Sequence, residues 1–436
     1  MIGWKIKMRR IIYVITMGFL AFLICFSNPA LSQYHDFPHY HYMEVTKESE
    51  IYSWVGEHII KVGLFKKGQI LKVAEEEGEE SGNYALHFGN GVGYIAKGNL
   101  KEIQKTAYPS DPFSTSPFHK KAAQNLIIIK MVQVHSTPDT DSQPIAILRE
   151  NLRYPVLDKL QDPFHHTWYE INLGDRLGYI SDRDAELDNG IPLLTYHHVL
   201  KDIKRFLHTS TTTSLTVFRE QMAYLKRAGY TTISLYELEG YLNGSINLPA
   251  KVVGLTFDDG LKSVYRYAYP ILKENGQKAT LFVISSRVKC HPQKWDPDTL
   301  QFLSLPELYA MQDVFDVQSH THFLHRFSKN QQPILLSRSY HNILYDFRRS
   351  RRALSQLNPH VLYLSYPFGR YNLKAMKAAK QAGFHLAVTT VKGKVKLGDN
   401  PFSLKRLYIL RTDPIEKMAK MIANKPYLTP LGSLNN

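Results

Sequence analysis

The chain has 436 residues, and its 54 lysines and arginines against 39 aspartates and glutamates give a formal net charge of +15. This length predicts about two to four domains, and a composition of 44% hydrophobic and 21% charged residues excludes a largely disordered chain. The only two cysteines, Cys25 and Cys290, exclude a disulfide scaffold or a cysteine-rich zinc fold, so any metal must be held by histidines and carboxylates. The positive charge suits nucleic acid, an anionic membrane or an anionic cell wall, and composition does not choose among them.

Residues 1–32 predict a secretory signal peptide. Four basic residues precede an apolar run at 11–26, and the small residues Ala30 and Ser32 follow at the spacing of a cleavage site. The alternative is an uncleaved anchor, because the run is just short of a comfortable membrane span. Cys25 lacks the small neighbours of a lipidation site, and removal of the signal would leave Cys290 without a disulfide partner. We therefore expect an extracellular or cell-wall-associated protein, anchored if the signal is uncleaved, whose charge attracts it to an anionic envelope and not to nucleic acid.

Two stretches, 44–103 and 126–187, share an order of short alternating segments separated by glycine, asparagine and aspartate turns. Each contains an aromatic strand, Asn83–Phe88 in the first and Trp168–Leu173 in the second, followed by a Gly-Tyr-Ile segment. This pattern is typical of small barrels of short strands. It resembles bacterial SH3-like domains, which often bind cell-wall polymers, so we expect the pair to bind an anionic wall. The alternative is a pair of spacers that bind nothing. The Pro/Ser-rich residues between them, 104–125, are predicted to form a linker.

From residue 191 to about 425, short apolar runs alternate with helical patterns, which predicts an α/β domain with a parallel sheet. One helical stripe is Phe218, Met222 and Leu225, and it is most simply explained as core. The number of strands suffices to close a barrel, whose chemistry would lie at the carboxyl ends of its strands. The predicted strands are Leu193–Tyr196, Thr232–Leu235, Val252–Phe257, Ala279–Ile284, Val314–Val317, Leu362–Tyr366, Leu386–Thr389 and Leu407–Leu410.

Adjacent carboxylates and a cluster of histidines follow two of these strands. Asp258 and Asp259 come directly after 252–257, so one can bind a metal while the other stays free as a base, although Asp-Asp-Gly alone is also a common turn. His320, His322 and His325 come after 314–317. One aspartate with two histidines is a ligand set typical of a catalytic divalent metal.

The histidine spacing leaves the ligand pair open. His320 and His325 would lie about 140° apart on a helix, so they can share a metal only across a loop or an irregular turn. His322 and His325 would be helical neighbours. A further histidine, His197, ends the strand 193–196 and is a candidate acid, with a hydrogen bond to backbone as the plainer alternative. The turn 366–369, Tyr-Pro-Phe-Gly, is suited to presenting backbone N–H groups to a ligand.

These motifs together resemble the polysaccharide deacetylases with a NodB-homology domain, carbohydrate esterase family 4. The segment 256–260, Thr-Phe-Asp-Asp-Gly, matches the first motif of that family, and 319–325 matches the second in the S-H-T-x-x-L-H form of exported biofilm poly-N-acetylglucosamine deacetylases. The turn 366–369 resembles the third, and 194–197 resembles the L-x-Y-H segment that opens this branch. The resemblance implies a distorted (β/α) barrel at 191–425 that is preceded by the two small all-β barrels.

The resemblance also implies a role for each residue at the site. Asp259, His320 and His325 would hold a divalent metal, which we expect to be Zn²⁺, with Co²⁺ or Ni²⁺ as alternatives. The resemblance further implies roles for residues outside the ligand set, namely Asp258 as general base, His197 as general acid for the leaving amine, the Phe368 backbone N–H in stabilising the oxyanion, and Tyr366 beside it.

One departure concerns the residue that orients the base. Many family members carry an arginine where Ser365 stands, and no clear D-x-x-D-W motif supplies its usual partner. Arg406, on the last predicted strand, is the candidate substitute.

The resemblance implies hydrolysis of N-acetyl groups from a β-linked N-acetylglucosamine polymer, an acetylated polysaccharide substrate. The branch-specific histidine motif favours the biofilm polymer. The SH3-like pair and the predicted export to the cell wall keep peptidoglycan as an alternative. A second alternative, a non-catalytic wall-binding protein with a retired deacetylase domain, is disfavoured by the complete set of aspartates and histidines.

Overall fold

The computed structural model describes residues 37, 39–55, 58–75, 82–105, 124–201, 211–409 and 413–425. The predicted signal peptide and nearly all of the predicted linker lie outside these residues. In the part of the chain that is described, no helix is both long and apolar enough to cross a membrane.

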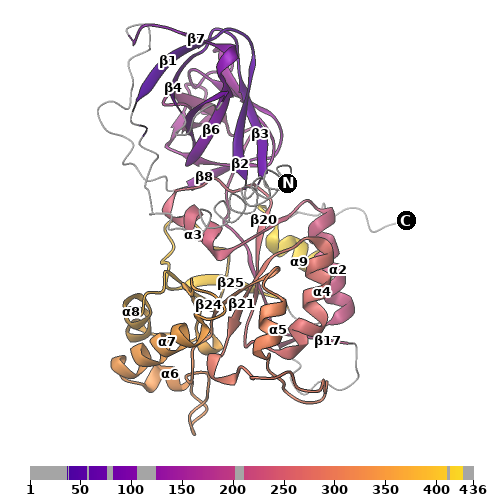
Figure 1. Ribbon diagram of the computed structural model, residues 1–436. Coiled ribbons are helices and arrows are strands. Elements are labelled where there is room, and N and C mark those ends of the chain that lie inside the picture. The colour runs from indigo at the N-terminus through magenta and orange to yellow at the C-terminus, as the bar shows by residue number, and fades with distance from the viewer. Residues whose placement is uncertain are drawn as a thin grey trace, which may run out of the picture. The chain divides into compact units, whose positions relative to one another are not determined.

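The carboxyl-terminal domain is built on one parallel sheet, in the order β16-β25-β24-β23-β22-β21-β20-β19. Because β16 also pairs in parallel with β20, the first seven of these strands close into a barrel and β19 extends it on the outside. The predicted (β/α) barrel is therefore confirmed (Figure 1). The strands are β16 (Leu193–Tyr196), β19 (Thr231–Ile233), β20 (Val252–Phe257), β21 (Ala279–Val283), β22 (Phe315–Ser319), β23 (Tyr363–Ser365), β24 (Leu386–Lys392) and β25 (Leu404–Tyr408).

The barrel is distorted, and the distortion lies near the ends of the strands that carry the polar motifs. Strand β22 pairs with β23 through one residue pair, Ser319 with Leu364, and the β24–β25 register shifts between Val388 and Lys392. The central strand β20 is buried along its whole length, as expected for a strand covered on both faces.

Helices follow the strands and cover the sheet (Figure 1). The predicted stripe Phe218, Met222 and Leu225 is buried on one of them, and the hydroxyl of Ser214 accepts a hydrogen bond from the Val217 N–H at its start. The helices are α2 (Leu215–Arg227), α3 (Leu235–Asn243), α4 (Tyr269–Asn275), α5 (Leu305–Ala310), α6 (Ile334–Ser337), α7 (Tyr340–Leu354), α8 (Leu373–Gln381) and α9 (Ile415–Ile422).

The amino-terminal part is all-β, as predicted, but its two modules share one sheet. Strand β10 of the second module pairs antiparallel with β3 of the first, and one hydrophobic cluster contains side chains from both, such as Phe65 and Ile145. The longer sheet has the order β12-β13-β14-β9-β10-β3-β2-β6-β5-β4-β1-β7, and β11-β8-β15 form a second one. That the modules are SH3-like stays a prediction.

The strands of the first module are β1 (Tyr40–Val45), β2 (Ser49–Val55), β3 (His58–Phe65), β4 (Ile70–Glu75), β5 (Asn83–Phe88), β6 (Gly91–Ala96) and β7 (Leu100–Glu102). Those of the second are β8 (Gln124–Ile128), β9 (Val132–His135), β10 (Pro144–Leu148), β11 (Leu152–Val156), β12 (Asp158–Gln161), β13 (Thr167–Asn172), β14 (Leu177–Ser181) and β15 (Glu186–Leu187). A short pair, β17 (His198–Leu200) and β18 (Thr212–Ser214), lies in the barrel domain.

Candidate active site

The polar motifs meet at the carboxyl ends of the barrel strands, which is where enzymes built on (β/α) barrels carry their catalytic residues. Asp258 and Asp259 follow β20, His320 follows β22 and His197 follows β16. The loop after β22 also carries His325. Five strands therefore contribute to one polar cluster, because β23 ends in Ser365 and β25 contains Arg406.

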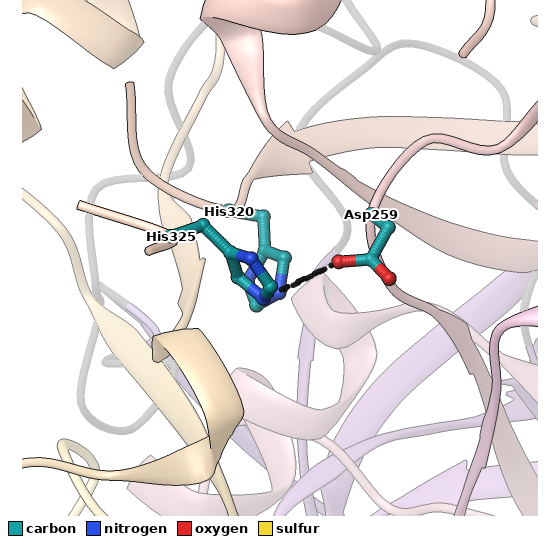
Figure 2. A group of neighbouring side chains, drawn as sticks. All are labelled: Asp259, His320 and His325. Carbon is teal, nitrogen blue, oxygen red and sulfur yellow. Dashed lines mark ion pairs between the residues drawn. The ribbon is translucent and has the colours of Figure 1, made fainter. Parts of the chain in front are cut away.

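Asp259, His320 and His325 form a group that can hold a metal ion, with one ligand atom from each side chain within 4.8 Å of the others. The Nε2 atoms of His320 and His325 lie 3.5 Å and 3.4 Å from Asp259 Oδ1 (Figure 2). This oxygen is buried and has no hydrogen-bond partner among the described residues. A buried carboxylate oxygen without a partner is costly unless a cation or another donor occupies the position in front of it. The donor set therefore fits a divalent metal.

The two histidines differ in protonation. Burial acts to lower the pKa of His320, but Asp259 and Asp258 outweigh it and raise that pKa, so a metal ion would compete with a proton for its Nε2 atom. The Nδ1 atom of His320 lies 2.8 Å from the Ser365 carbonyl oxygen, and donation there leaves the Nε2 lone pair directed at Asp259. Burial and the neighbouring His320 lower the pKa of His325 to about 3, so its imidazole is neutral at pH 7. Burial acts to raise the pKa of Asp259, but the neighbouring histidines outweigh it and hold the pKa well below its usual value.

His322 lies apart from this group, which decides between the two ligand pairs that spacing left open. Its Nδ1 atom is 2.9 Å from the Ser285 hydroxyl, and its ring packs edge-on against Phe323. Between His320 and His325 the backbone is irregular, as a shared metal would require at this spacing, and Thr321 has a φ of +68°.

Asp346, which sequence reasoning missed, supports the histidine loop. Its two carboxylate oxygens accept hydrogen bonds from the backbone N–H groups of His322, at 2.9 Å, and Phe323, at 2.6 Å. Asp346 lies on α7, and a single acidic residue in a helical pattern carries no sequence signal of such a role.

The second aspartate is held by a buried arginine from another strand. Arg406 Nη1 donates to Asp258 Oδ1 and Nη2 donates to Asp258 Oδ2, both at 2.8 Å, and the Ser365 hydroxyl donates to Oδ2 at 3.1 Å. Burial alone would raise the pKa of Asp258, but the charge and hydrogen bonds of Arg406 outweigh it and keep the carboxylate ionised. Arg406 thus stands where an orienting residue for Asp258 was expected.

His197 completes the cluster from the first strand. Its Nε2 atom lies 4.0 Å from Asp258 Oδ2, and its ring stacks on Tyr408 with centroids 5.9 Å apart. Burial lowers the pKa of His197, although Asp258 and Asp259 act in the opposite direction.

The turn after β23 places its two aromatic side chains differently. The Tyr366 ring is fully buried in the core, where its hydroxyl donates to the Phe402 carbonyl oxygen at 3.1 Å, so its side chain is not brought to the site. The Phe368 ring packs against His325 with centroids 4.2 Å apart. Gly369 has a φ of +65°, and a Cβ there would lie 2.0 Å from the Thr390 Cγ2 atom, so only glycine fits this turn.

We predict that the chain binds one Zn²⁺ ion through Asp259, His320 and His325. Replacement of His320 or His325 by alanine removes one of three protein ligands, so calorimetric titration should show at least about a tenfold loss of affinity. His322→Ala is the matched control and should bind as the wild type does. Equal losses for His322→Ala and His325→Ala would contradict this ligand set.

We predict that Arg406→Met lowers the free energy of unfolding by about 3–5 kcal/mol, because it leaves the Asp258 carboxylate buried without its cation. Lys405→Met, on the same strand, removes a partly exposed pair with Asp399 and should cost less than about 1 kcal/mol. Denaturant unfolding measures both. Equal costs would show that the Arg406–Asp258 pair contributes no more than a surface pair.

The chain is similar in sequence to known polysaccharide deacetylases. Residues 245–387 match the family model described as polysaccharide deacetylase. The chain is 26% identical over 260 residues to a poly-beta-1,6-N-acetyl-D-glucosamine N-deacetylase of Staphylococcus aureus, covering 59% of this chain and 86% of that protein. It is 28% identical over 226 residues to a putative polysaccharide deacetylase, YxkH, of Bacillus subtilis, covering 50% of this chain and 71% of that protein.

Among solved structures, IcaB from Ammonifex degensii is 30% identical to this chain, with a TM-score of 0.46, and the match covers 53% of this chain and 96% of that one. The residues matched by the family model and the motifs at the strand ends both fall in the barrel domain. The chain therefore belongs to the polysaccharide deacetylase family.

Proposed function

We propose that this protein is a metal-dependent deacetylase that removes N-acetyl groups from a β-linked N-acetylglucosamine polymer, with the poly-β-1,6-linked biofilm polymer as its preferred substrate. The observation that carries this proposal is the pairing of two differently held aspartates. Asp259 faces two histidines with an unpartnered oxygen, whereas Asp258 is bound by Arg406 and lies beside His197. One carboxylate is thereby suited to bind a cation and the other to accept a proton.

A divalent ion held by Asp259, His320 and His325 would act as a Lewis acid and bring the pKa of water at the site to about 7. Asp258 serves as the general base for the attacking water. Arg406 holds this carboxylate in one orientation and keeps it ionised, so it is available to accept a proton at neutral pH.

The remaining roles fall to His197 and Phe368. An amine leaves readily only after protonation, and the Nε2 atom of His197 lies 4.0 Å from Asp258 Oδ2. His197 supplies that proton. The backbone N–H of Phe368 donates to the developing oxyanion, a role supported by the rigid turn that packs its ring against His325.

The substrate preference rests on likeness to the Staphylococcus aureus enzyme, whose name states its polymer, and on the seven-residue histidine motif. Peptidoglycan is the competing acetylated polymer. It differs in its β-1,4 linkage and in the peptide-bearing sugars of its backbone, so a direct comparison separates the two.

We predict release of primary amines from purified poly-β-1,6-N-acetylglucosamine by the zinc-loaded protein. Asp258→Asn should reduce the rate by at least about 10²-fold, because it removes the general base. His322→Ala is the control for a nearby polar change and should keep most of the rate. Amine release from peptidoglycan alone would overturn the substrate preference, and full activity of Asp258→Asn would overturn the mechanism.

The net charge of +15 and the all-β amino-terminal part support a second element of the proposal, attachment to an anionic cell envelope. Such attachment is electrostatic, so we predict that co-sedimentation with isolated walls falls steeply between low salt and about 1 M salt, where the screening length shrinks to about 3 Å. Retention unchanged by salt would contradict this mode of attachment.

A further inference from the structure

A groove of about 640 Å³ lies next to the active site, between the histidine loop and helices α6 and α7. Four of the residues that line it are basic: Arg326, Lys329, Arg338 and Arg349. We call this the basic groove. Its lining also contains exposed aromatic rings, including Phe327 and Tyr345.

The basic groove is joined to the metal ligands by stacked rings. Phe327 stacks on Phe368 with centroids 4.0 Å apart and an interplanar angle of 26°, and Phe368 in turn packs against His325 at 4.2 Å. A polymer whose reacting sugar lies beside His325 can therefore reach the basic groove across Phe368 and Phe327.

The four cations of the basic groove outnumber its one carboxylate, Asp346. None of the four lies within ion-pair distance of a carboxylate among the described residues. The one carboxylate of the lining, Asp346, already accepts hydrogen bonds from two backbone N–H groups of the histidine loop. The groove thus carries more positive than negative charge, and Asp346 offsets this excess only in part, through its interaction with Arg349.

Two of the arginines are positioned by an aromatic ring. The guanidinium carbons of Arg326 and Arg349 lie 5.3 Å and 5.2 Å from the Phe323 ring centroid. Stacking of this kind restrains a guanidinium while leaving its N–H donors free for a ligand. Guanidinium groups bind carboxylates and phosphates through paired hydrogen bonds, whereas the exposed rings offer surfaces for the apolar C–H faces of sugars.

We propose that the basic groove binds an acidic substituent, a carboxylate or a phosphate, carried by the acetylated polymer near the sugar being deacetylated. This inference rests on the proposed function and adds a charge requirement to it. The same cations repel the positively charged amines that deacetylation produces, so the groove favours acetylated or acidic stretches of the polymer over deacetylated ones.

The test compares two soluble oligomers of N-acetylglucosamine, one neutral and one carrying carboxymethyl groups on some hydroxyls. We expect kcat/KM at low salt to be about tenfold higher for the carboxymethylated oligomer, because charge-assisted hydrogen bonds add to its binding. In the double variant Arg326→Gln/Arg349→Gln this ratio should fall to near 1. A phosphorylated oligomer in place of the carboxymethylated one shows which acid is preferred.

Two further variants separate the effect of charge in the basic groove from the effect of the protein's net charge. Arg326→Lys/Arg349→Lys keeps both charges and should retain much of the preference. Arg227→Gln/Lys420→Gln removes two exposed charges from α2 and α9, and should leave the ratio as in the wild type. A ratio that falls equally in this control would assign the preference to net charge and would overturn the proposal.

Binding measured without turnover keeps this test separate from that of the proposed function. Calorimetry of both oligomers with the Asp258→Asn variant gives the same comparison if deacetylation itself fails. Equal affinity for the two oligomers, or a preference that survives Arg326→Gln/Arg349→Gln, would overturn the proposal. Tight binding of a single-stranded oligonucleotide in place of the carboxymethylated oligomer would overturn it in favour of nucleic-acid recognition.

Discussion

The buried ion pair between Arg406 and Asp258 is the interaction on which the arrangement of the site depends. Neither group is exposed enough for water to replace its partner, since Arg406 is fully buried and Asp258 is 2% exposed. Each charge therefore requires the other. The pair links β25, which carries Arg406, to the end of β20, which Asp258 follows. A carboxylate confined in this way keeps one orientation, as the proposed role of Asp258 as a base requires.

Ser365 connects this pair to the candidate metal ligand His320. Its hydroxyl donates to Asp258 and accepts from Arg406, while its backbone carbonyl lies against the Nδ1 atom of His320. A small residue at this position leaves room for the guanidinium that enters from β25. Arg406 thus contacts Asp258 from β25, and the serine at 365 leaves space for its guanidinium group.

The surroundings of the site carry a charge pattern that the reaction alone does not require. Asp258 and Asp259, compensated by histidines and an arginine, occupy the centre, and cations in excess of carboxylates lie in the groove beside it. Phe368 and Phe327 stack on each other between the two regions.

The sequence by itself determined the parallel barrel, its strands to within a few residues, and the candidacy of Asp258, Asp259 and the histidines, because continuous apolar runs and the polar residues that end them are local signals. Spacing alone left His320 and His322 open as partners of His325, and the family resemblance favoured His320. The tertiary structure gives the physical reason, an irregular turn at Thr321 beside backbone N–H groups bound by Asp346 from a distant helix. The bidentate contact of Arg406 with Asp258 and the burial of the Tyr366 ring are likewise results of packing. These contacts join residues far apart in the chain, and no periodicity or spacing encodes them.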